Sequence, residues 1–139
     1  MTYKSLLLTT TFIFSPLTAA DSVSVSQVMS IYDGDTFNAN VAEWPPIVGL
    51  NIPVRIRGID TPELRGKCQK EKELARAAKQ FTVSQLRAAK QIELKDISRG
   101  KYFRLIASVY VDGKNLGDIL LQQKLAVPYS GAKKPNWCD

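Results

Sequence analysis

Histidine is absent from this chain of 139 residues, and its absence limits the acid–base chemistry available to it. Histidine is the only side chain whose ordinary pKa lies between pH 5 and 8. Proton transfer must therefore fall to carboxylates, a metal ion or bound water. Cysteine is also scarce, since only Cys68 and Cys138 are present. Two cysteines without histidine cannot fill the four positions of a structural zinc site.

Acidic residues are fewer than basic ones. The 13 Asp and Glu residues against 19 Lys and Arg residues give a formal charge of +6. A basic surface favours polyanionic partners such as nucleic acids or anionic membranes. No apolar run beyond residue 20 reaches the roughly 20 residues that a membrane-spanning helix needs. The length, with no internal repeat and no low-complexity linker, indicates one domain.

The first 20 residues are typical of a secretory signal peptide. Lys4 supplies a positive start, residues 5–17 carry no charge, and Ala19-Ala20 offers small residues for cleavage before Asp21. The alternative is an N-terminal helix that packs into the core. We predict a signal peptide at 1–20, a mature domain at 21–139 and a periplasmic or secreted location.

The two cysteines suggest a disulfide, because an even number of cysteines in an exported chain usually pairs. A Cys68–Cys138 bond would tie the C-terminus to the middle of the domain and close a loop of about 70 residues. In the chain-entropy model such a loop contributes on the order of 4 kcal/mol. The alternative is two free thiols.

Hydrophobic periodicity predicts five strands and two helices. The strands are expected at 23–31, 36–42, 52–57, 91–97 and 103–111, and the helices at 71–89 and 116–123. On the first helix, one face is expected to carry Leu74, Ala78, Phe81 and Ala88. Turns are expected at 33–34, 98–101 and 112–113, a loop at 44–46, and an irregular tail from Pro128. This order predicts an α+β domain with a closed or partly open barrel.

Two short runs, 33–36 and 55–63, concentrate groups that could hold a divalent cation against a phosphodiester. Carboxylates bind hard cations, and a guanidinium meets two phosphate oxygens at once. The candidate carboxylates are Asp33, Asp35, Asp60 and Glu63, and the candidate guanidiniums are Arg55, Arg57 and Arg104.

Each run also has a plain structural interpretation. Asp33-Gly34-Asp35 can simply form a hairpin turn. Arg55 and Arg57 can lie on a solvated strand face, and residues 61–63 can cap the segment that follows. Arg104, between apolar neighbours, can form a structural salt bridge.

The segments in combination resemble the thermonuclease, or staphylococcal-nuclease-like, family. The matching segments are Asp33–Phe37, Val54–Glu63, Tyr102–Arg104 and Val109–Lys114, with Leu125-Ala126 after them. The resemblance covers residues 23–130 in order. It implies an OB-fold, a five-stranded barrel with two or three packed helices, and a Ca²⁺-dependent nuclease that acts on DNA and RNA as a monomer and leaves 3′-phosphates.

The resemblance also implies a role for individual residues. Asp35 and Asp60 would bind the cation through carboxylates, and Thr61 through its carbonyl. Glu63 would orient or deprotonate the attacking water. Arg55 and Arg104 would bind the phosphate, with Asp33 and Arg57 in supporting roles. Tyr102 would stack on a base of a single-stranded substrate, and Tyr129 is an approximate counterpart of a second family tyrosine.

Two departures and two other function classes accompany this resemblance. The loop at 44–46 differs from the family pattern, and the chain ends soon after Trp137, where a long C-terminal helix would stand. The domain could instead be a nucleic-acid-binding OB-fold without catalysis. It could also be an exported basic protein that binds anionic surfaces. The presence of all five of Asp35, Arg55, Asp60, Glu63 and Arg104 favours the nuclease.

Overall fold

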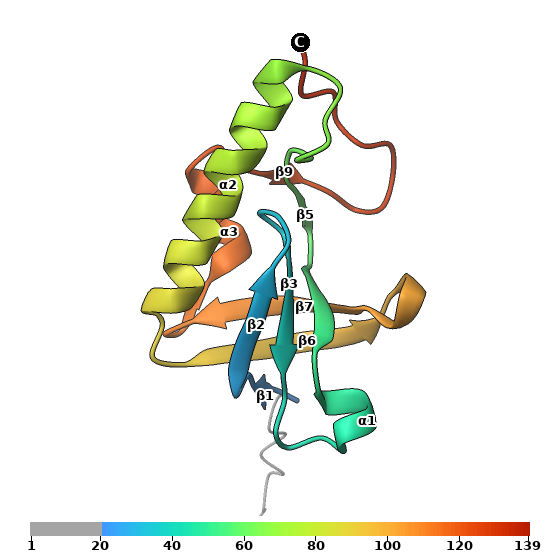
Figure 1. Ribbon diagram of the computed structural model, residues 1–139, viewed down its shortest axis with the longest axis vertical. Coiled ribbons are helices and arrows are strands. Elements are labelled where there is room, and N and C mark those ends of the chain that lie inside the picture. The colour runs from blue at the N-terminus through green and yellow to red at the C-terminus, as the bar shows by residue number, and fades with distance from the viewer. Residues whose placement is uncertain (1–20) are drawn as a thin grey trace, which may run out of the picture.

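The computed structural model describes residues 21–139, so the predicted signal peptide at 1–20 lies outside the described residues (Figure 1). Within them, the strands are β1 (Val23–Ser24), β2 (Gln27–Ile31), β3 (Thr36–Asn40), β4 (Ile52–Ile56), β5 (Ile59–Asp60), β6 (Ile92–Arg99), β7 (Leu105–Val111), β8 (Lys114–Asn115) and β9 (Val127–Pro128). The helices are α1 (Pro46–Gly49), α2 (Gln69–Ala88), α3 (Leu116–Gln122) and the 3-10 turn η1 (Lys101–Phe103). None of these helices is both long and apolar enough to span a membrane.

One mixed sheet forms the body of the domain, with the strand order β1-β6-β7-β4-β3-β2 and β8 paired with β7. Burial alternates along its strands, so that every second residue of β7 from Leu105 to Val111 is buried. Such alternation places one face of the sheet against the core. β4 and β7 pair in parallel, with Val54 opposite Leu105, and both side chains belong to the core. The predicted α+β class is confirmed.

The predicted first strand, 23–31, is two strands in the structure. β1 pairs with β6 at one end of the sheet, whereas β2 pairs with β3 and forms the other end. At the break between them, Val25 donates a backbone hydrogen bond to Ile92 (2.9 Å) and Ser26 donates one to Asn40 (2.8 Å). The segment therefore bridges both ends of the sheet and curls it into a partly open barrel (Figure 1).

Helix α2 lies along one side of the barrel and begins two residues earlier than predicted (Figure 1). Its buried face also differs from the predicted one, because Leu74 and Phe81 are only partly buried and Ala88 is exposed. The fully buried positions are Glu71, Ala75, Ala78, Thr82 and Leu86. This stripe keeps the helical spacing of three or four residues but includes a carboxylate and a hydroxyl. Both polar groups contact loops that lead to the candidate site.

The second predicted helix is confirmed as α3, which Asn115 caps by accepting hydrogen bonds from the N–H groups of Gly117 and Asp118. The predicted loop at 44–46 leads into α1, one turn of helix that starts with Pro46. Proline suits this first position because its missing N–H would have no helical partner.

The predicted strand at 103–111 begins only at Leu105. Before it, η1 forms the tip of the β6–β7 connection, and Tyr102 and Phe103 both adopt positive φ angles, 56° and 62°. Tyr102 is 93% exposed and Phe103 is 57% exposed. The guanidinium of Arg99 lies 4.2 Å from the centre of the Phe103 ring and also donates to the Phe103 carbonyl. This support holds the tip in a backbone conformation that large residues rarely adopt.

The predicted irregular tail is held at two places. β9 pairs antiparallel with β5 at Val127 and Pro128, which forms a second small sheet. Further on, Cys138 forms a disulfide with Cys68, and the two Cα atoms lie 5.9 Å apart. The tail therefore returns to the start of α2, beside the loop that carries Glu63.

Candidate active site

The turn between β2 and β3 is fixed against helix α2. Thr82 donates a hydrogen bond of 2.7 Å from its hydroxyl to the Gly34 carbonyl. A Cβ atom at Gly34 would lie only 2.8 Å from the Cβ of Ala78, so this position requires glycine. The Asp-Gly-Asp turn predicted from the sequence is thus also a packing contact, and it sets the position of Asp35.

Asp35 and Asp60 are both buried, each with about 1% of its surface exposed. Arg55 joins them, because its Nη1 lies 2.7 Å from Oδ1 of Asp35 and its Nη2 lies 2.9 Å from Oδ1 of Asp60. The three residues come from different elements, with Asp35 before β3, Arg55 in β4 and Asp60 in β5. Two buried carboxylates thus share one guanidinium.

Thr61 completes this group. Its backbone N–H donates a 3.0 Å hydrogen bond to Oδ2 of Asp35, and its buried hydroxyl has no hydrogen-bond partner among the described residues. Carboxylate, carbonyl and hydroxyl oxygens are the donors that hard divalent cations prefer. Asp35, Asp60 and Thr61 therefore fit such a cation by donor type and by charge.

A different cluster meets a purely geometric criterion for metal ligands. In the described part of the chain, only Cys68, Glu71 and Cys138 bring three acidic or thiol ligand atoms within 4.8 Å of one another. The two sulfur atoms are joined in the disulfide and cannot act as thiolates. This cluster is therefore a structural one.

Glu63 lies at the edge of the site and is exposed. Its Oε1 forms an ion pair with Nζ of Lys134, which also lies 3.5 Å from Oδ1 of Asp60. Burial disfavours the Lys134 ammonium, but the hydrogen bond to Glu63 and the attraction of both carboxylates outweigh it and raise the pKa of Lys134. Lys134 was not among the predicted site residues.

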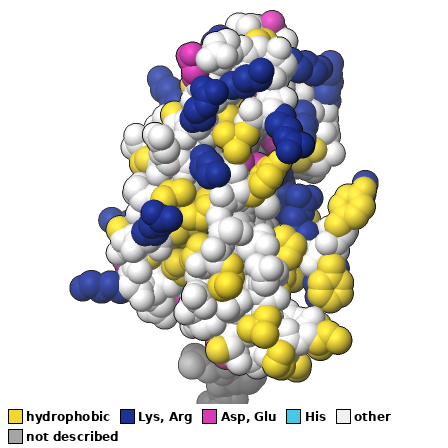
Figure 2. All heavy atoms as spheres, viewed as in Figure 1, with side chains coloured by type: hydrophobic (Ala, Val, Ile, Leu, Met, Phe, Trp, Pro, Cys, Tyr) yellow, Lys and Arg dark blue, Asp and Glu magenta, His cyan; other side chains and the backbone are white. Residues whose placement is uncertain are grey.

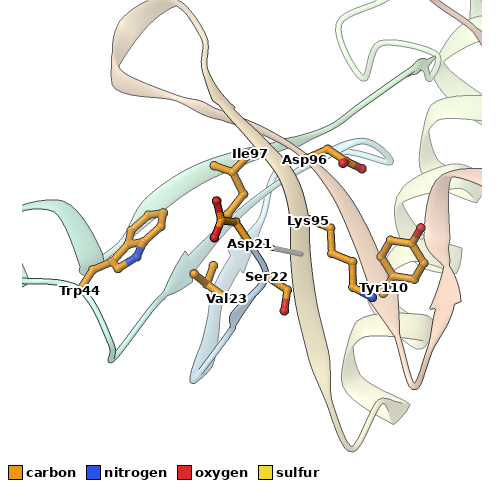
Figure 3. Close-up of a pocket in the computed structure, with 8 residues that line it drawn as sticks. All are labelled: Asp21, Ser22, Val23, Trp44, Lys95, Asp96, Ile97 and Tyr110. Atoms are coloured by element: carbon orange, nitrogen blue, oxygen red, sulfur yellow. The ribbon is translucent and has the colours of Figure 1, made fainter. Parts of the chain in front are cut away.

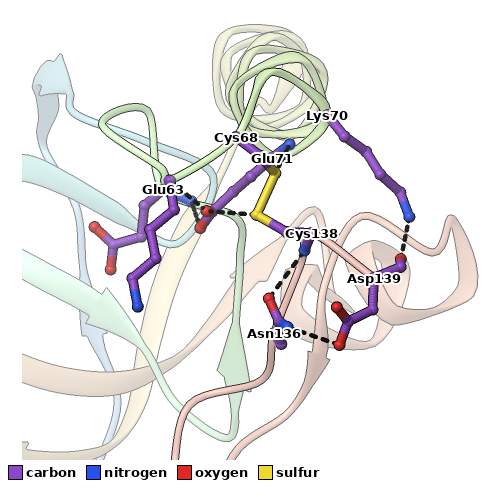
Figure 4. The surroundings of a disulfide bond; sticks show 8 residues. Glu63, Cys68, Lys70, Glu71, Asn136, Cys138 and Asp139 are labelled. Carbon is purple, nitrogen blue, oxygen red and sulfur yellow. Dashed lines mark hydrogen bonds between the residues drawn. A yellow bond between two sulfur atoms is a disulfide. The ribbon is translucent and has the colours of Figure 1, made fainter.

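Glu71 holds the backbone of the loop that carries Glu63. Its carboxylate accepts hydrogen bonds from the N–H groups of Glu63 (3.3 Å) and Lys67 (2.9 Å) (Figure 4). Glu71 is itself 7% exposed and lies beside the disulfide. Glu71 stands three residues before Leu74 and seven before Ala78, so a carboxylate on the predicted apolar face is the sequence signal that could have identified it.

A cavity of about 280 Å³ opens beside these groups. It is lined by Tyr32, Asp33, Thr36, Arg55, Glu63, Arg104, Tyr129 and Lys134. The Nε atom of Arg104 is buried without a hydrogen-bond partner among residues 21–139. The Tyr129 ring lies beside Arg55, with 5.9 Å between the guanidinium carbon and the ring centre. The structure thus brings Arg55, Glu63, Arg104 and Tyr129 to one cavity.

Two predicted residues belong neither to this cavity nor to the buried group formed by Asp35, Arg55, Asp60 and Thr61. Tyr102 is at the exposed tip of the β6–β7 connection and does not line the cavity. Arg57 faces β6, where it donates 2.7 Å and 2.6 Å hydrogen bonds to the Asp96 carbonyl and the Ser98 hydroxyl. Its position next to the β6 bulge gives Arg57 a structural role in the barrel.

Asp33 has a strongly shifted pKa. Burial in the turn, and secondly repulsion by Asp35, raise the pKa of Asp33 from 3.8 to about 7, although its hydrogen bond from the Asp35 N–H and the charge of Arg55 oppose the shift. Two carboxylates so close together cannot both ionise easily. Asp33 therefore holds a proton more readily than an ordinary aspartate does.

A family model described as staphylococcal nuclease homologue matches residues 53–137. The chain belongs to this family. The match confirms the resemblance seen in the sequence and, with the curled mixed sheet and three helices, the OB-fold. No curated protein is similar enough to count as a match. Asp33 and Asp35 precede the matched region, so their assignment to the site depends on the contacts with Arg55 and Thr61.

The surface of this family member is basic around the site. Figure 2 shows Lys and Arg side chains gathered on the half of the molecule that carries the start of α2 and the tail. A separate cavity of about 790 Å³ lies near β1 and contains Trp44, Lys95 and Tyr110 (Figure 3). It contains none of the predicted site residues, and its Asp21 and Asp96 make it less suited to a polyanion.

Proposed function

We propose that this protein is a metal-dependent nuclease, with Ca²⁺ as the cation, that hydrolyses phosphodiester bonds of DNA and RNA. The observation that carries the proposal is the pair of buried carboxylates, Asp35 and Asp60, joined by Arg55 beside a cavity that Glu63 and Arg104 also line. Membership of a family of nuclease homologues supports the same conclusion.

In this proposal the residues divide the work by charge and position. Asp35, Asp60 and the Thr61 carbonyl hold the cation. Bound there, the cation would neutralise negative charge on the phosphodiester. Glu63, the exposed carboxylate at the mouth, orients the attacking water and accepts its proton. No histidine is available for this step.

Arg55 and Arg104 bind the phosphate oxygens and stabilise the charge that develops in the transition state. The buried Nε of Arg104, which has no partner among the described residues, provides a donor for this purpose. The attacking water forms a bond to phosphorus, the bond to the 5′ oxygen breaks, and that oxygen takes a proton from solvent. The phosphate therefore stays on the 3′ oxygen of the other product. Tyr129 beside Arg55 and exposed Tyr102 offer aromatic faces for bases of a single strand.

We further propose that the mature protein, residues 21–139, acts as a monomer in the periplasm or outside the cell. The Cys68–Cys138 disulfide fits an oxidising compartment. The millimolar Ca²⁺ of such compartments would suit a weak cation site.

Incubation of the mature protein with single-stranded DNA, in Ca²⁺ and in EDTA, tests the proposal. We expect cleavage in Ca²⁺, no cleavage in EDTA, and products with 3′-phosphate ends. Tight binding without cleavage under both conditions would instead support an OB-fold that only binds nucleic acid. Cleavage in EDTA at an unchanged rate would remove the cation from the proposal.

A further inference from the structure

Lys134 enters the candidate site from a distant part of the chain. Its Nζ lies 3.5 Å from Oδ1 of buried Asp60 and forms an ion pair with Oε1 of Glu63. In the proposed function, Asp60 binds the cation and Glu63 orients the attacking water. A lysine 71 residues beyond Glu63 has no local reason to contact either of them. Its position depends on the path of the tail.

The tail is fixed on both sides of Lys134. On one side, Tyr129 donates a backbone hydrogen bond of 2.9 Å to Gly58, next to the β5–β9 pairing. On the other side, Cys138 is bonded to Cys68 at the start of α2 (Figure 4). The Asp139 carbonyl accepts a hydrogen bond from Lys70, which adds a further anchor (Figure 4). Lys134 thus lies on a strap that is attached at both ends, next to β5 on one side and at the start of α2 on the other.

Oδ1 of Asp60 lies close to two positively charged side chains of the same chain. Arg55 donates to it at 2.9 Å and Lys134 approaches it at 3.5 Å. A divalent cation held by Asp60 would add two positive charges beside the ammonium, and like charges at such distances repel strongly outside bulk water. Lys134 is half exposed, with 50% of its side-chain surface accessible, so its flexible chain can turn into solvent. Arg55 is less free, because only 15% of its side chain is exposed.

We propose that Lys134 is a built-in counter-ion of the cation site, which neutralises Asp60 and Glu63 until a divalent cation displaces it. This inference rests on the proposed cation site and adds to it a residue that the sequence did not single out. The same displacement frees Glu63, which pairs with Lys134 and is the proposed group for orienting water. Filling of the cation site and release of Glu63 are thereby coupled through one lysine.

Calorimetric titration of the metal-stripped protein with Ca²⁺, in the absence of any substrate, tests this proposal. We expect Lys134→Gln to bind Ca²⁺ about threefold to fivefold more tightly than wild type, the size of effect expected from losing a partly exposed ion pair. Lys133→Gln is the matched control, because Lys133 is exposed and forms no ion pair within residues 21–139. It removes the same charge and should change the Kd by less than about twofold. Equal Kd values for the two variants would overturn the proposal.

Two further variants separate the ion pair from general effects on the fold. Lys134→Arg keeps the cation and should bind Ca²⁺ within about twofold of wild type, as expected if the charge is what competes. Cys138→Ser releases the tail and should tighten Ca²⁺ binding much as Lys134→Gln does. In that background, the added Lys134→Gln change should have almost no effect. Full additivity of the two changes would show that the tail does not hold Lys134 in place, against the proposal.

The wild-type titration also distinguishes a failure of the proposed cation site from a failure of the role proposed for Lys134. If the wild-type protein and all variants fail to bind Ca²⁺, the cation site of the proposed function is wrong and the role of Lys134 falls with it. If wild type binds Ca²⁺ and Lys134→Gln matches Lys133→Gln, only the role of Lys134 is wrong.

Discussion

Arg55 in β4 forms a salt bridge of 2.7 Å with Asp35, the residue just before the neighbouring antiparallel strand β3. The Asp35 side chain is almost completely buried, and that of Arg55 is 15% exposed. An arginine proposed to bind a phosphate is therefore also the main partner of a buried carboxylate. The same guanidinium reaches Asp60, so one side chain links the proposed cation ligands to the cavity that Glu63 and Arg104 line.

Arg55→Ala should therefore reduce both stability and activity. Removing one partner of a buried ion pair leaves uncompensated charge, and we expect a loss of about 2–4 kcal/mol in the free energy of unfolding without divalent cation. Turnover should fall by about 10²–10³-fold or more. Urea unfolding in EDTA and in Ca²⁺ measures the first effect, and Ca²⁺ should restore part of the loss because it binds only the folded protein. Unchanged stability in EDTA would contradict the importance of the ion pairs.

Arg104→Ala should separate the two effects. Arg104 lines the same cavity, but its buried Nε has no partner in the described part of the chain. We expect turnover to fall by about 10²–10³-fold, while the free energy of unfolding changes by less than about 1 kcal/mol. Single-stranded DNA cleavage and urea unfolding are the measurements. Arg87→Ala, at an exposed position on α2, is the control for lost positive charge. Cleavage by Arg104→Ala at the wild-type rate would refute the assignment.

The parts of the site that lie in local patterns could be predicted from the sequence. The turn at 33–36 and the strand predicted to end at Arg57 follow from the Asp-Gly dipeptide and from alternation. These patterns place Asp35, Arg55 and Asp60 among several candidates, and the family resemblance then assigns them to the site. The sequence by itself suggests little loss of fold for Arg55→Ala. The structure instead predicts a loss of stability, because Arg55 pairs with buried Asp35 and Asp60. These ion pairs depend on how the strands pack in three dimensions, which the sequence does not show.

The parts that depend on distant contacts could not be predicted. Lys134 reaches Asp60 only because β9 and the disulfide direct the tail, and no periodicity marks that path. The strand predicted to start at Phe103 begins two residues later, because Tyr102 and Phe103 adopt positive φ angles. The sequence did not indicate this, since large residues rarely adopt that conformation. The sequence makes Arg57 a candidate for phosphate binding because a guanidinium can bind phosphate oxygens. In the structure it instead donates to the Asp96 carbonyl in the bulge of β6.

Tyr102→Gly should weaken substrate binding without harming the fold. Tyr102 is 93% exposed and has a φ of 56°, a conformation that glycine adopts without strain. We expect the free energy of unfolding to stay constant or rise by up to about 1 kcal/mol. Affinity for a single-stranded oligonucleotide, measured by fluorescence anisotropy in EDTA, should fall by about 1–3 kcal/mol through lost stacking. Tyr102→Phe keeps the ring and should retain the affinity. Unchanged binding by Tyr102→Gly would remove Tyr102 from the substrate site.

Asp33 should make the metal-free protein less stable as the pH rises. Its pKa is about 7 in the folded protein against an ordinary 3.8, so the folded state binds the proton more tightly than the unfolded state does. The stabilisation from this proton is full below about pH 4 and is lost as the pH rises through 7. Each pKa unit is worth about 1.4 kcal/mol, and allowing for partial exposure we expect a loss on the order of 2 kcal/mol.

Urea unfolding of wild type and Asp33→Asn between pH 4 and 8, in EDTA, measures this loss. The free energy of unfolding of wild type relative to Asp33→Asn should decrease across that range, because the asparagine does not titrate. Asn can still accept the hydrogen bond from the Asp35 N–H, so the turn is kept. Parallel pH profiles for the two proteins would show that Asp33 titrates normally.

Reduction of the disulfide should lower stability. Cys68 and Cys138 are separated by 70 residues, and a loop of this size contributes on the order of 4 kcal/mol in the chain-entropy model. Because the bond also lies against Glu71, which supports the backbone of Glu63, the loop at 63–67 should become more mobile as well. We expect a lower midpoint of thermal unfolding after reduction and faster amide exchange at 63–67. The amides of β7, buried in the core, should keep their exchange rates under native conditions. A midpoint that does not change on reduction would mean that the β5–β9 pairing alone holds the tail in place.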